Sequence, residues 1–329
     1  MHDPDDKSTE NVPSTVPFNR APRQAVPVSD SRHRIFDREL LALRRDRRAE
    51  QVMATDFLHR HVADDIAGRL ALVKRRFPVA LDLGAGQGLL ADRLRTAGAD
   101  YVVSADPSPR LLAHAQPPTV VADEELLPFR DGCFDLVVSG LALQVVDDLP
   151  GALIQIRRAL KPDGLLMAAL LGGLSLHELR EALVQAETET TGGASPRVAP
   201  FADVRELGGL LQRAGFTLPV ADSETLSVGY ASALHLMRDL RSLGWSNMLR
   251  DRRRVPLARS TLERAIEIYQ QRHGRPDGRV KATFEVVTLT GWAPHESQQK
   301  PLRPGSATSR LADALGTAEQ TADDKAAGS

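Results

Sequence analysis

Five apolar runs separated by amphipathic segments constrain the fold of this 329-residue chain more than any other feature. The runs cover residues 77–84, 99–106, 118–123, 134–143 and 164–173. Each is apolar on both faces, which is typical of strands buried inside a sheet. Helical patterns lie between them, near 89–97, 108–115 and 150–160. Strand, helix, strand at this spacing predicts an α/β fold with a doubly wound, mostly parallel sheet.

The first run ends in the stretch VALDLGAGQGLL, where an acid precedes three alternating glycines. Ligands of such sheets bind beyond the carboxyl ends of the strands, where the strand order reverses. The glycines are Gly84, Gly86 and Gly88, so the third glycine of an NAD fingerprint is replaced by Leu89. Asp82 would repel a pyrophosphate but could orient an ammonium group. S-adenosylmethionine has an ammonium group and no phosphate, so it fits this turn better than NAD.

Further polar residues follow the next strands. Asp106 ends the second run, where an acid accepts hydrogen bonds from ribose hydroxyls. Asp123 and Glu124 follow the third run, where an acid can accept from the adenine amino group, and Ser139 lies in the fourth. The sequence therefore predicts an S-adenosylmethionine site formed by Asp82, Gly84, Gly86, Gly88, Asp106, Asp123, Glu124 and Ser139.

The segment after the fifth run should form the acceptor side of the site. GGLSLHELREAL predicts a helix that starts at the open end of the sheet, with His177 and Arg180 three positions apart on one face. His177 is a candidate general base and Arg180 a second candidate catalytic residue. Gln144 and Ser175 are candidate substrate contacts. Amphipathic helices over 232–245 and 260–273 exceed what the core needs and would form a lid or a docking face.

Several motifs resemble a known superfamily. LDLGAGQG, SADPS, ADEELLPF and FDLVVSGLALQVVDDLPGALIQIRRALKPDGLL look, in this order, like the motifs of class I S-adenosylmethionine-dependent methyltransferases. IFDRELLALRRDRRA, the segment 170–216 and GWAPHESQQKPLRPGSAT narrow the resemblance to the mitochondrial complex I assembly factor 5 family and its alphaproteobacterial relatives. The resemblance implies a seven-stranded Rossmann-like sheet, S-adenosylmethionine as cofactor and a role in complex I assembly. Because the mitochondrial factor is linked to hydroxylation of an arginine on an iron–sulfur subunit, the resemblance also implies a protein substrate.

Three positions depart from the family pattern beside the expected acceptor pocket. Gln144 and Val145 stand where the family carries His-Trp, and Leu174 stands where an acidic residue is common. An amide still forms hydrogen bonds, but the proton-accepting imidazole and the indole face are lost. Three functions therefore stay open: modification of a complex I subunit by methylation or hydroxylation, O-methylation of a small molecule or acyl-carrier substrate as in biotin synthesis, and non-catalytic assistance of assembly.

Charge and composition limit the classes of partner that we expect this chain to bind. The net charge of −1 does not favour nucleic acid, which basic proteins bind by releasing counterions. Arginine-rich stretches at 32–48 and 250–259 are expected to form solvated faces. The first also resembles an N-terminal helix that closes over the cofactor. The second could meet an acidic partner or an anionic membrane surface. The sequence contains no run of about 18 apolar residues, so we expect no membrane span.

A few residues indicate whether the chain binds a metal ion and in which cellular compartment it acts. The single cysteine, Cys133, fits a reducing compartment and provides no zinc pair. His59 and His61 are two positions apart, so on a helix their rings would point apart, and we expect surface or packing roles and no metal. We expect the protein in the cytoplasm of a bacterium, or in the mitochondrial matrix of a eukaryote.

The pattern also predicts the domain organisation. Residues 1–31 lack an apolar period and are predicted to form a disordered arm, and 296–329 a largely disordered tail. Between them, 32–295 should form one methyltransferase-fold domain, with a core over 77–173, an acceptor or lid segment over 174–281 and a final strand over about 282–293.

Overall fold

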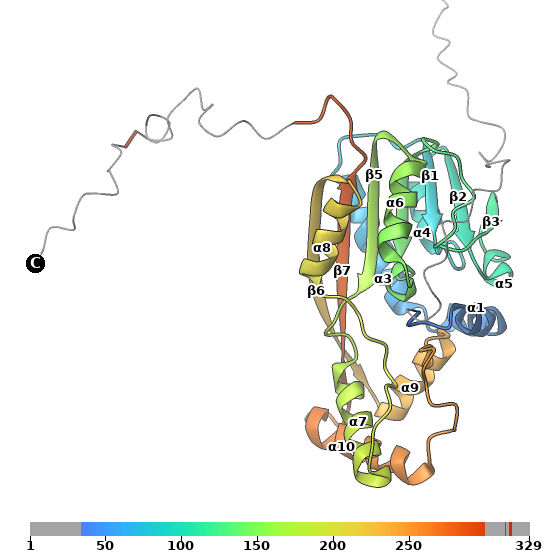
Figure 1. Ribbon diagram of the computed structural model, residues 1–329, viewed down its shortest axis with the longest axis vertical. Helices are drawn as coiled ribbons and strands as arrows, with labels where there is room; N and C mark the ends of the chain where they lie inside the picture. The colour runs from blue at the N-terminus through green and yellow to red at the C-terminus, as the bar shows by residue number, and fades with distance from the viewer. Residues whose placement is uncertain (1–33, 300–312, 314–315, 318–329) are drawn as a thin grey trace, which may run out of the picture. The chain divides into compact units, whose positions relative to one another are not determined.

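The computed structural model describes residues 34–299, 313 and 316–317 (Figure 1). The predicted N-terminal arm and most of the predicted tail lie outside these residues. The chain divides after Pro294 into two units, and every helix and strand named below belongs to the first. Among the described helices, none is both long and apolar enough to cross a membrane.

A seven-stranded sheet forms the centre of the first unit, with the strand order β3-β2-β1-β4-β5-β7-β6. The strands from β3 to β5 are parallel, whereas β7 runs antiparallel between β5 and β6. Their bounds are β1 Val79–Leu83, β2 Tyr101–Asp106, β3 Thr119–Val121, β4 Phe134–Gly140, β5 Leu160–Leu171, β6 Thr217–Tyr230 and β7 Val280–Trp292. The predicted doubly wound, mostly parallel sheet is confirmed, and the strand order reverses between β1 and β4.

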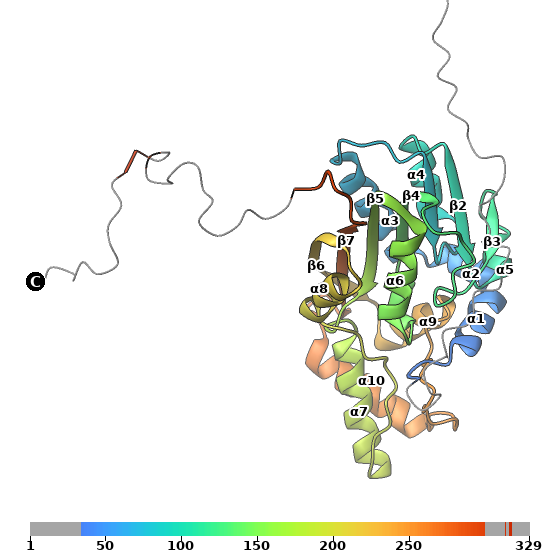
Figure 2. The ribbon, with the colours of Figure 1, turned by 45° about the horizontal axis from the view of Figure 1, so that its top comes forward.

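Helices cover both faces of this sheet (Figures 1 and 2). α3 and α4 pack on one face and α6 and α8 on the other, which is why every residue of β1 is buried. The helices are α1 Arg38–Arg47, α2 Ala49–Ala54, α3 Phe57–Ala71, α4 Leu89–Thr96, α5 Pro109–Leu112, α6 Leu149–Ala159, α7 His177–Thr191, α8 Val204–Arg213, α9 Ala233–Ser242 and α10 Arg259–His273. A 3-10 turn, η2, spans Leu143–Val145.

A helical layer lies beyond the carboxyl end of the parallel strands. Figure 1 shows α7, α9 and α10 there, below the sheet, where β6 and β7 extend toward them. α7 and α10 pack together, and the hydroxyls of Thr190 and Thr261 lie 2.7 Å apart between them. The predicted helices at 232–245 and 260–273 are therefore present as α9 and α10, at the open end of the sheet where ligands bind.

Candidate functional site

The glycine turn after β1 borders a cavity at the point where the strand order reverses. Gly84, Gly86 and Gly88 all have positive φ angles, which L-residues rarely adopt. A Cβ on Gly84 would also lie 2.1 Å from the Cβ of Ala142, so the turn packs directly on the segment after β4. Gly84 and Gly86 line this cavity together with Asp82, Gly140, Leu111 and Leu243. We call it the cofactor cavity.

Asp82 is buried at the end of β1 and lines the cofactor cavity. Its Oδ2 accepts a hydrogen bond from the Ala91 N–H in the first turn of α4, at 3.0 Å. Burial raises the pKa of Asp82 to about 7, because the charged form loses its hydration and gains only this one backbone donor. A buried carboxyl of this kind is suited to bind a ligand cation.

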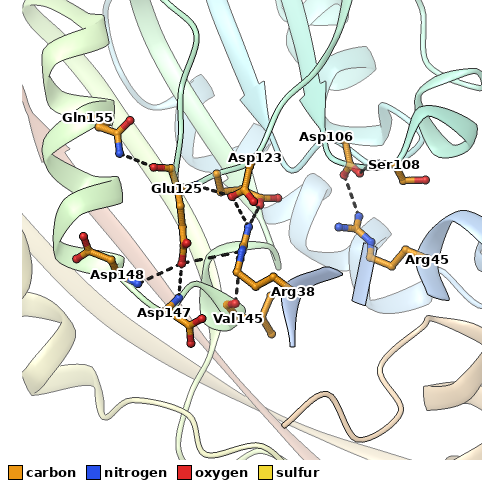
Figure 3. A network of polar contacts seen from close by, with 11 residues as sticks. Arg38, Arg45, Asp106, Ser108, Asp123, Glu125, Val145, Asp147, Asp148 and Gln155 are labelled. Carbon is orange, nitrogen blue, oxygen red and sulfur yellow. Dashed lines mark hydrogen bonds and ion pairs between the residues drawn. The ribbon is translucent and has the colours of Figure 1, made fainter. Parts of the chain in front are cut away.

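Asp106 lies between the Arg45 guanidinium and Ser108 at the start of α5 (Figure 3). Its Oδ2 accepts from the Gly86 N–H and its Oδ1 from the Ser108 N–H, at 2.9 and 2.8 Å. The Arg45 guanidinium of α1 also donates to Oδ2, at 2.9 Å. The acid predicted to bind ribose is therefore held in place by two backbone donors and paired with an arginine.

The acids after β3 line a neighbouring hollow with Arg38, Arg45 and Pro107. Arg38 donates to Asp123 at 2.6 Å, to Glu124, and to the Val145 carbonyl at 2.9 Å. Burial raises the pKa of the Glu124 carboxyl, while the charge of Arg38 acts in the opposite direction. Arg45 lines both this hollow and the cofactor cavity, so the two spaces adjoin at the Arg45–Asp106 pair.

The two arginines of α1 lie in a stretch for which a solvated face is expected, with closure over the cofactor as the alternative, and their contacts with the acids after β2 and β3 favour the alternative. Arg38 and Arg45 are seven positions apart, which places them on the same face of a helix. This seven-residue spacing is the sequence feature that indicates a shared role for the two arginines. The other side of α1 is fixed by Arg44, which donates to the carbonyls of Ser246 and Asn247 at 3.0 and 2.8 Å. α1 therefore links the cofactor acids to the segment that follows α9.

A second cavity, of about 200 Å³, lies between η2, α7 and α9, and we call it the acceptor cavity. Its lining is mostly apolar and includes Leu171, Leu179, Met237, Leu240 and Trp245. Gln144 also lines it. The indole of Trp245 lies 5.5 Å, between ring centroids, from the ring of His59, which lines the cofactor cavity. The two cavities therefore meet across the His59–Trp245 contact.

His59, for which a surface or packing role is expected, packs against Trp245 and also lines the cofactor cavity. The ring is half-buried beside the cofactor cavity, and its Nδ1 is buried and has no hydrogen-bond partner among the described residues. Burial, with the nearby Arg45 charge, lowers the pKa of His59 to about 4, so the ring is neutral at neutral pH. The expected separation from His61 holds, because His61 faces Glu224 at 3.0 Å. Nothing in the local sequence distinguishes the two.

Of the four residues predicted for the acceptor side, Gln144 alone is among those lining the acceptor cavity. The Ser175 hydroxyl is buried and bonds to the backbone of Glu285 in β7, both as donor and as acceptor. Its proton is therefore not free for a substrate. Ser139, predicted for the cofactor, is buried in β4 next to Gly140, and its hydroxyl has no partner among the described residues.

His177 and Arg180 lie on the first turn of α7. The His177 ring packs edge-on against His273 of α10, with 6.2 Å between centroids, and its Nδ1 is 2.9 Å from the Leu174 carbonyl. Arg180 donates to the carbonyl of Ala199, a cavity-lining residue, at 3.2 Å. Arg180 thus contacts the cavity wall, whereas His177 faces α10.

Comparison with known proteins identifies relatives of this chain and a solved structure with the same fold. Residues 81–168 match a family model described as a methyltransferase domain. The human mitochondrial arginine-hydroxylase NDUFAF5 is 42% identical over 281 residues, covering 83% of this chain and 81% of that protein. A malonyl-[acyl-carrier protein] O-methyltransferase of Halorhodospira halophila is 38% identical over 269 residues, covering 78% and 88%. The crystal structure of Bacillus subtilis YcgJ shares the fold, with a TM-score of 0.50 and 14% identity over 71% of this chain and 99% of that one.

Proposed function

The chain belongs to the methyltransferase-fold family of the mitochondrial arginine hydroxylase NDUFAF5, and we propose that it binds S-adenosylmethionine and modifies a protein subunit during assembly of respiratory complex I. The observation that carries this proposal is the meeting of two cavities across His59 and Trp245. One has the residues that S-adenosylmethionine needs, and the other is an apolar space beside it. From the family, we infer that the substrate is an iron–sulfur subunit. We also infer that the protein acts in the bacterial cytoplasm or in the mitochondrial matrix.

The cofactor cavity, the neighbouring hollow and the Asp106 carboxyl that pairs with Arg45 between them offer a partner for each polar group of S-adenosylmethionine. Asp82 can neutralise the ammonium group, and the turn at Gly84 and Gly86 lets the backbone approach the ligand closely. Asp106 can accept from the ribose hydroxyls and Asp123 from the adenine amino group. When bound, S-adenosylmethionine supplies a methyl group activated by its sulfonium. Since Arg45 and Arg38 pair with these acids, cofactor binding competes with both ion pairs.

Titration calorimetry tests the choice of cofactor. We expect the purified protein to bind S-adenosylmethionine or its demethylated product and to have little affinity for NAD, because Asp82 would face a pyrophosphate at the glycine turn. Tight binding of NAD, with none of S-adenosylmethionine, would overturn the proposal.

The affinity for S-adenosylmethionine should depend on pH through Asp82. With a pKa of about 7 in the ligand-free protein, the carboxyl is increasingly protonated below that value and cannot pair with the ammonium. We expect Kd to rise by up to about tenfold per pH unit as pH falls below 7, and binding near pH 7 to release a proton. Calorimetry in buffers of different ionisation enthalpy measures both the Kd at each pH and the number of protons released on binding. Asp82→Asn should remove the dependence, and a pH-independent Kd in the unaltered protein would contradict the assignment.

The same pKa has a consequence for stability. Because the folded-state pKa of Asp82 lies above its ordinary value of 3.8, its contribution to stability is fully present below pH 3.8 and is lost as pH rises through about 7. A bound ammonium group offsets this loss, so the ligand should raise the melting temperature more above pH 7 than below it.

His177 and Arg180 are proposed residues of the acceptor side. We expect His177→Ala and Arg180→Ala to keep S-adenosylmethionine affinity within about twofold, because neither lines the cofactor cavity. Each should impair complex I maturation, Arg180→Ala more strongly because its guanidinium bonds to the cavity wall. The measurement is the NADH-dehydrogenase activity of membranes from a deletion strain carrying each variant. Full rescue by both would favour a non-catalytic assembly role.

O-methylation of an acyl-carrier substrate is the second candidate, since the Halorhodospira halophila relative carries that name. The deletion strain separates the two. Loss of complex I activity without a requirement for biotin supports the assembly role, and the reverse phenotype supports the acyl-carrier substrate.

A further inference from the structure

The amino-acid group of S-adenosylmethionine has a carboxylate as well as the ammonium that Asp82 can bind, and both are attached to one carbon atom. The partner of the carboxylate must therefore lie close to Asp82, in the same cofactor cavity. Among the described residues that line this cavity, three side chains have N–H groups: Arg45, His59 and Gln87. Their existing hydrogen bonds decide which of them is free to bind an anion.

Two of these three side chains already donate to acids. Arg45 pairs with Asp106, and the Gln87 amide donates to Asp56, each at 2.9 Å. The backbone of the glycine turn is used as well, because each N–H group from 84 to 86 donates to an oxygen of β2. A carboxylate that bound to any of these groups would have to displace an oxygen already in place.

His59 makes no hydrogen bond with any of the described residues. Its Nδ1 is enclosed by protein atoms. Its Nε2 is not enclosed, so this nitrogen is the one that a ligand in the cavity can reach. The imidazole packs on the indole of Trp245, with 5.5 Å between ring centroids and 48° between ring planes, and this contact holds the ring in its orientation. His59 thus offers a positioned and unused donor.

The surroundings of His59 favour a negative ligand group. Burial lowers the pKa of the imidazole, and the positive charge of Arg45 lowers it further. Asp56 acts in the opposite direction, but this carboxylate is paired with Arg60 at 2.8 Å. The ring is therefore neutral, with a single N–H, at a place where the charge of Arg45 attracts a carboxylate. Because Asp82 lines the same cavity, the cavity offers a partner for each charge of a zwitterion.

We propose that His59 binds the carboxylate of S-adenosylmethionine: its Nε2–H donates to a carboxylate oxygen while Asp82 binds the ammonium. This inference rests on the proposed function, because it takes the cofactor cavity to hold the amino-acid group. The same imidazole supports Trp245, which lines the acceptor cavity. One residue thus contacts the cofactor and stabilises a wall of the acceptor cavity.

Titration calorimetry with two ligands tests this assignment. The ligands are S-adenosylhomocysteine and its analogue in which a hydrogen replaces the carboxylate. The unaltered protein should bind the analogue about tenfold or more weakly, because a hydrogen bond to a charged acceptor is lost. His59→Leu should weaken the binding of S-adenosylhomocysteine by a similar factor and leave that of the analogue within about twofold. The effects of the two changes are then not additive, as expected for groups in contact.

Two further variants complete the design. His59→Gln keeps an N–H donor and should retain part of the preference for the carboxylate ligand. His61→Leu is the matched control on the same helix, because the His61 side chain is 40% exposed and faces Glu224. It should leave both affinities unchanged. Thermal unfolding verifies that each variant is folded. A preference in His59→Leu as large as in the unaltered protein, or an equal loss of affinity for both ligands, would overturn the inference.

The result is separable from that of the proposed function. If the unaltered protein binds neither ligand, the placement of the cofactor and the role of His59 are both overturned. A carboxylate preference that persists in His59→Leu removes the role of His59 and leaves the cofactor site in place. A His59-dependent preference, with normal complex I in the deletion strain, supports the role of His59 and contradicts the assembly role.

Discussion

Asp106→Ala should lower the affinity for S-adenosylmethionine by at least about 100-fold. Two ribose hydroxyls would lose a charged acceptor, and each such bond contributes about 1.5–3 kcal/mol. The substitution also removes the acceptor of the Gly86 and Ser108 N–H groups, which position the glycine turn and the start of α5. Titration calorimetry with the purified variant measures the change.

Asp64→Ala is the matched control for Asp106→Ala. Asp64 also pairs with an arginine, Arg93, but its side chain is 60% exposed on α3, whereas the Asp106 side chain is fully buried and bonds to the glycine turn. Its loss should leave the dissociation constant unchanged. If Asp106→Ala also leaves it unchanged, Asp106 is not the ribose acid.

Gly84→Ala should lower the free energy of unfolding by about 2–5 kcal/mol. A residue with a Cβ at φ +73° costs about 1–2 kcal/mol in backbone strain, and overpacking against Ala142 adds about 1–3 kcal/mol. Gly98→Ala is the control, because its φ is +95° but nothing lies within 4 Å of the added Cβ. It should cost about 1–2 kcal/mol.

Urea denaturation of the two alanine variants compares these losses. A larger loss in Gly84→Ala supports direct packing of the glycine turn on the segment that leads to Gln144. Equal losses would show that the turn has room to move, and would remove the reason for a glycine at this position.

The parallel half of the fold was predictable because its strands are buried on both faces. The five apolar runs became β1 to β5, and the helices between them lie where their patterns indicated. β6 was not located in the sequence, because it is an edge strand with half of its side chains toward solvent. Leu226, Val228 and Tyr230 recur at every second position there, which is a strand signal confined to the end of β6.

The polar site was predictable only in part. Strand ends identify Asp82 and Asp106, because the topology brings carboxyl ends of parallel strands to one edge. Partners that come from distant segments leave no such signal: Arg45 reaches Asp106 across 61 positions, and Ser175 is satisfied by Glu285 across 110. The position of His59 against Trp245 depends on tertiary packing, which no local pattern encodes.

The intact mass of the iron–sulfur subunit of complex I tests the central claim most directly. The subunit is isolated from the wild-type strain, from the deletion strain, and from the deletion strain that carries Asp106→Ala. If this protein modifies the subunit, the wild-type subunit should be heavier than the other two, by one methylene group for methyl transfer from S-adenosylmethionine, or by one oxygen atom for hydroxylation, which needs a separate oxidant. Identical masses in all three strains would contradict the account.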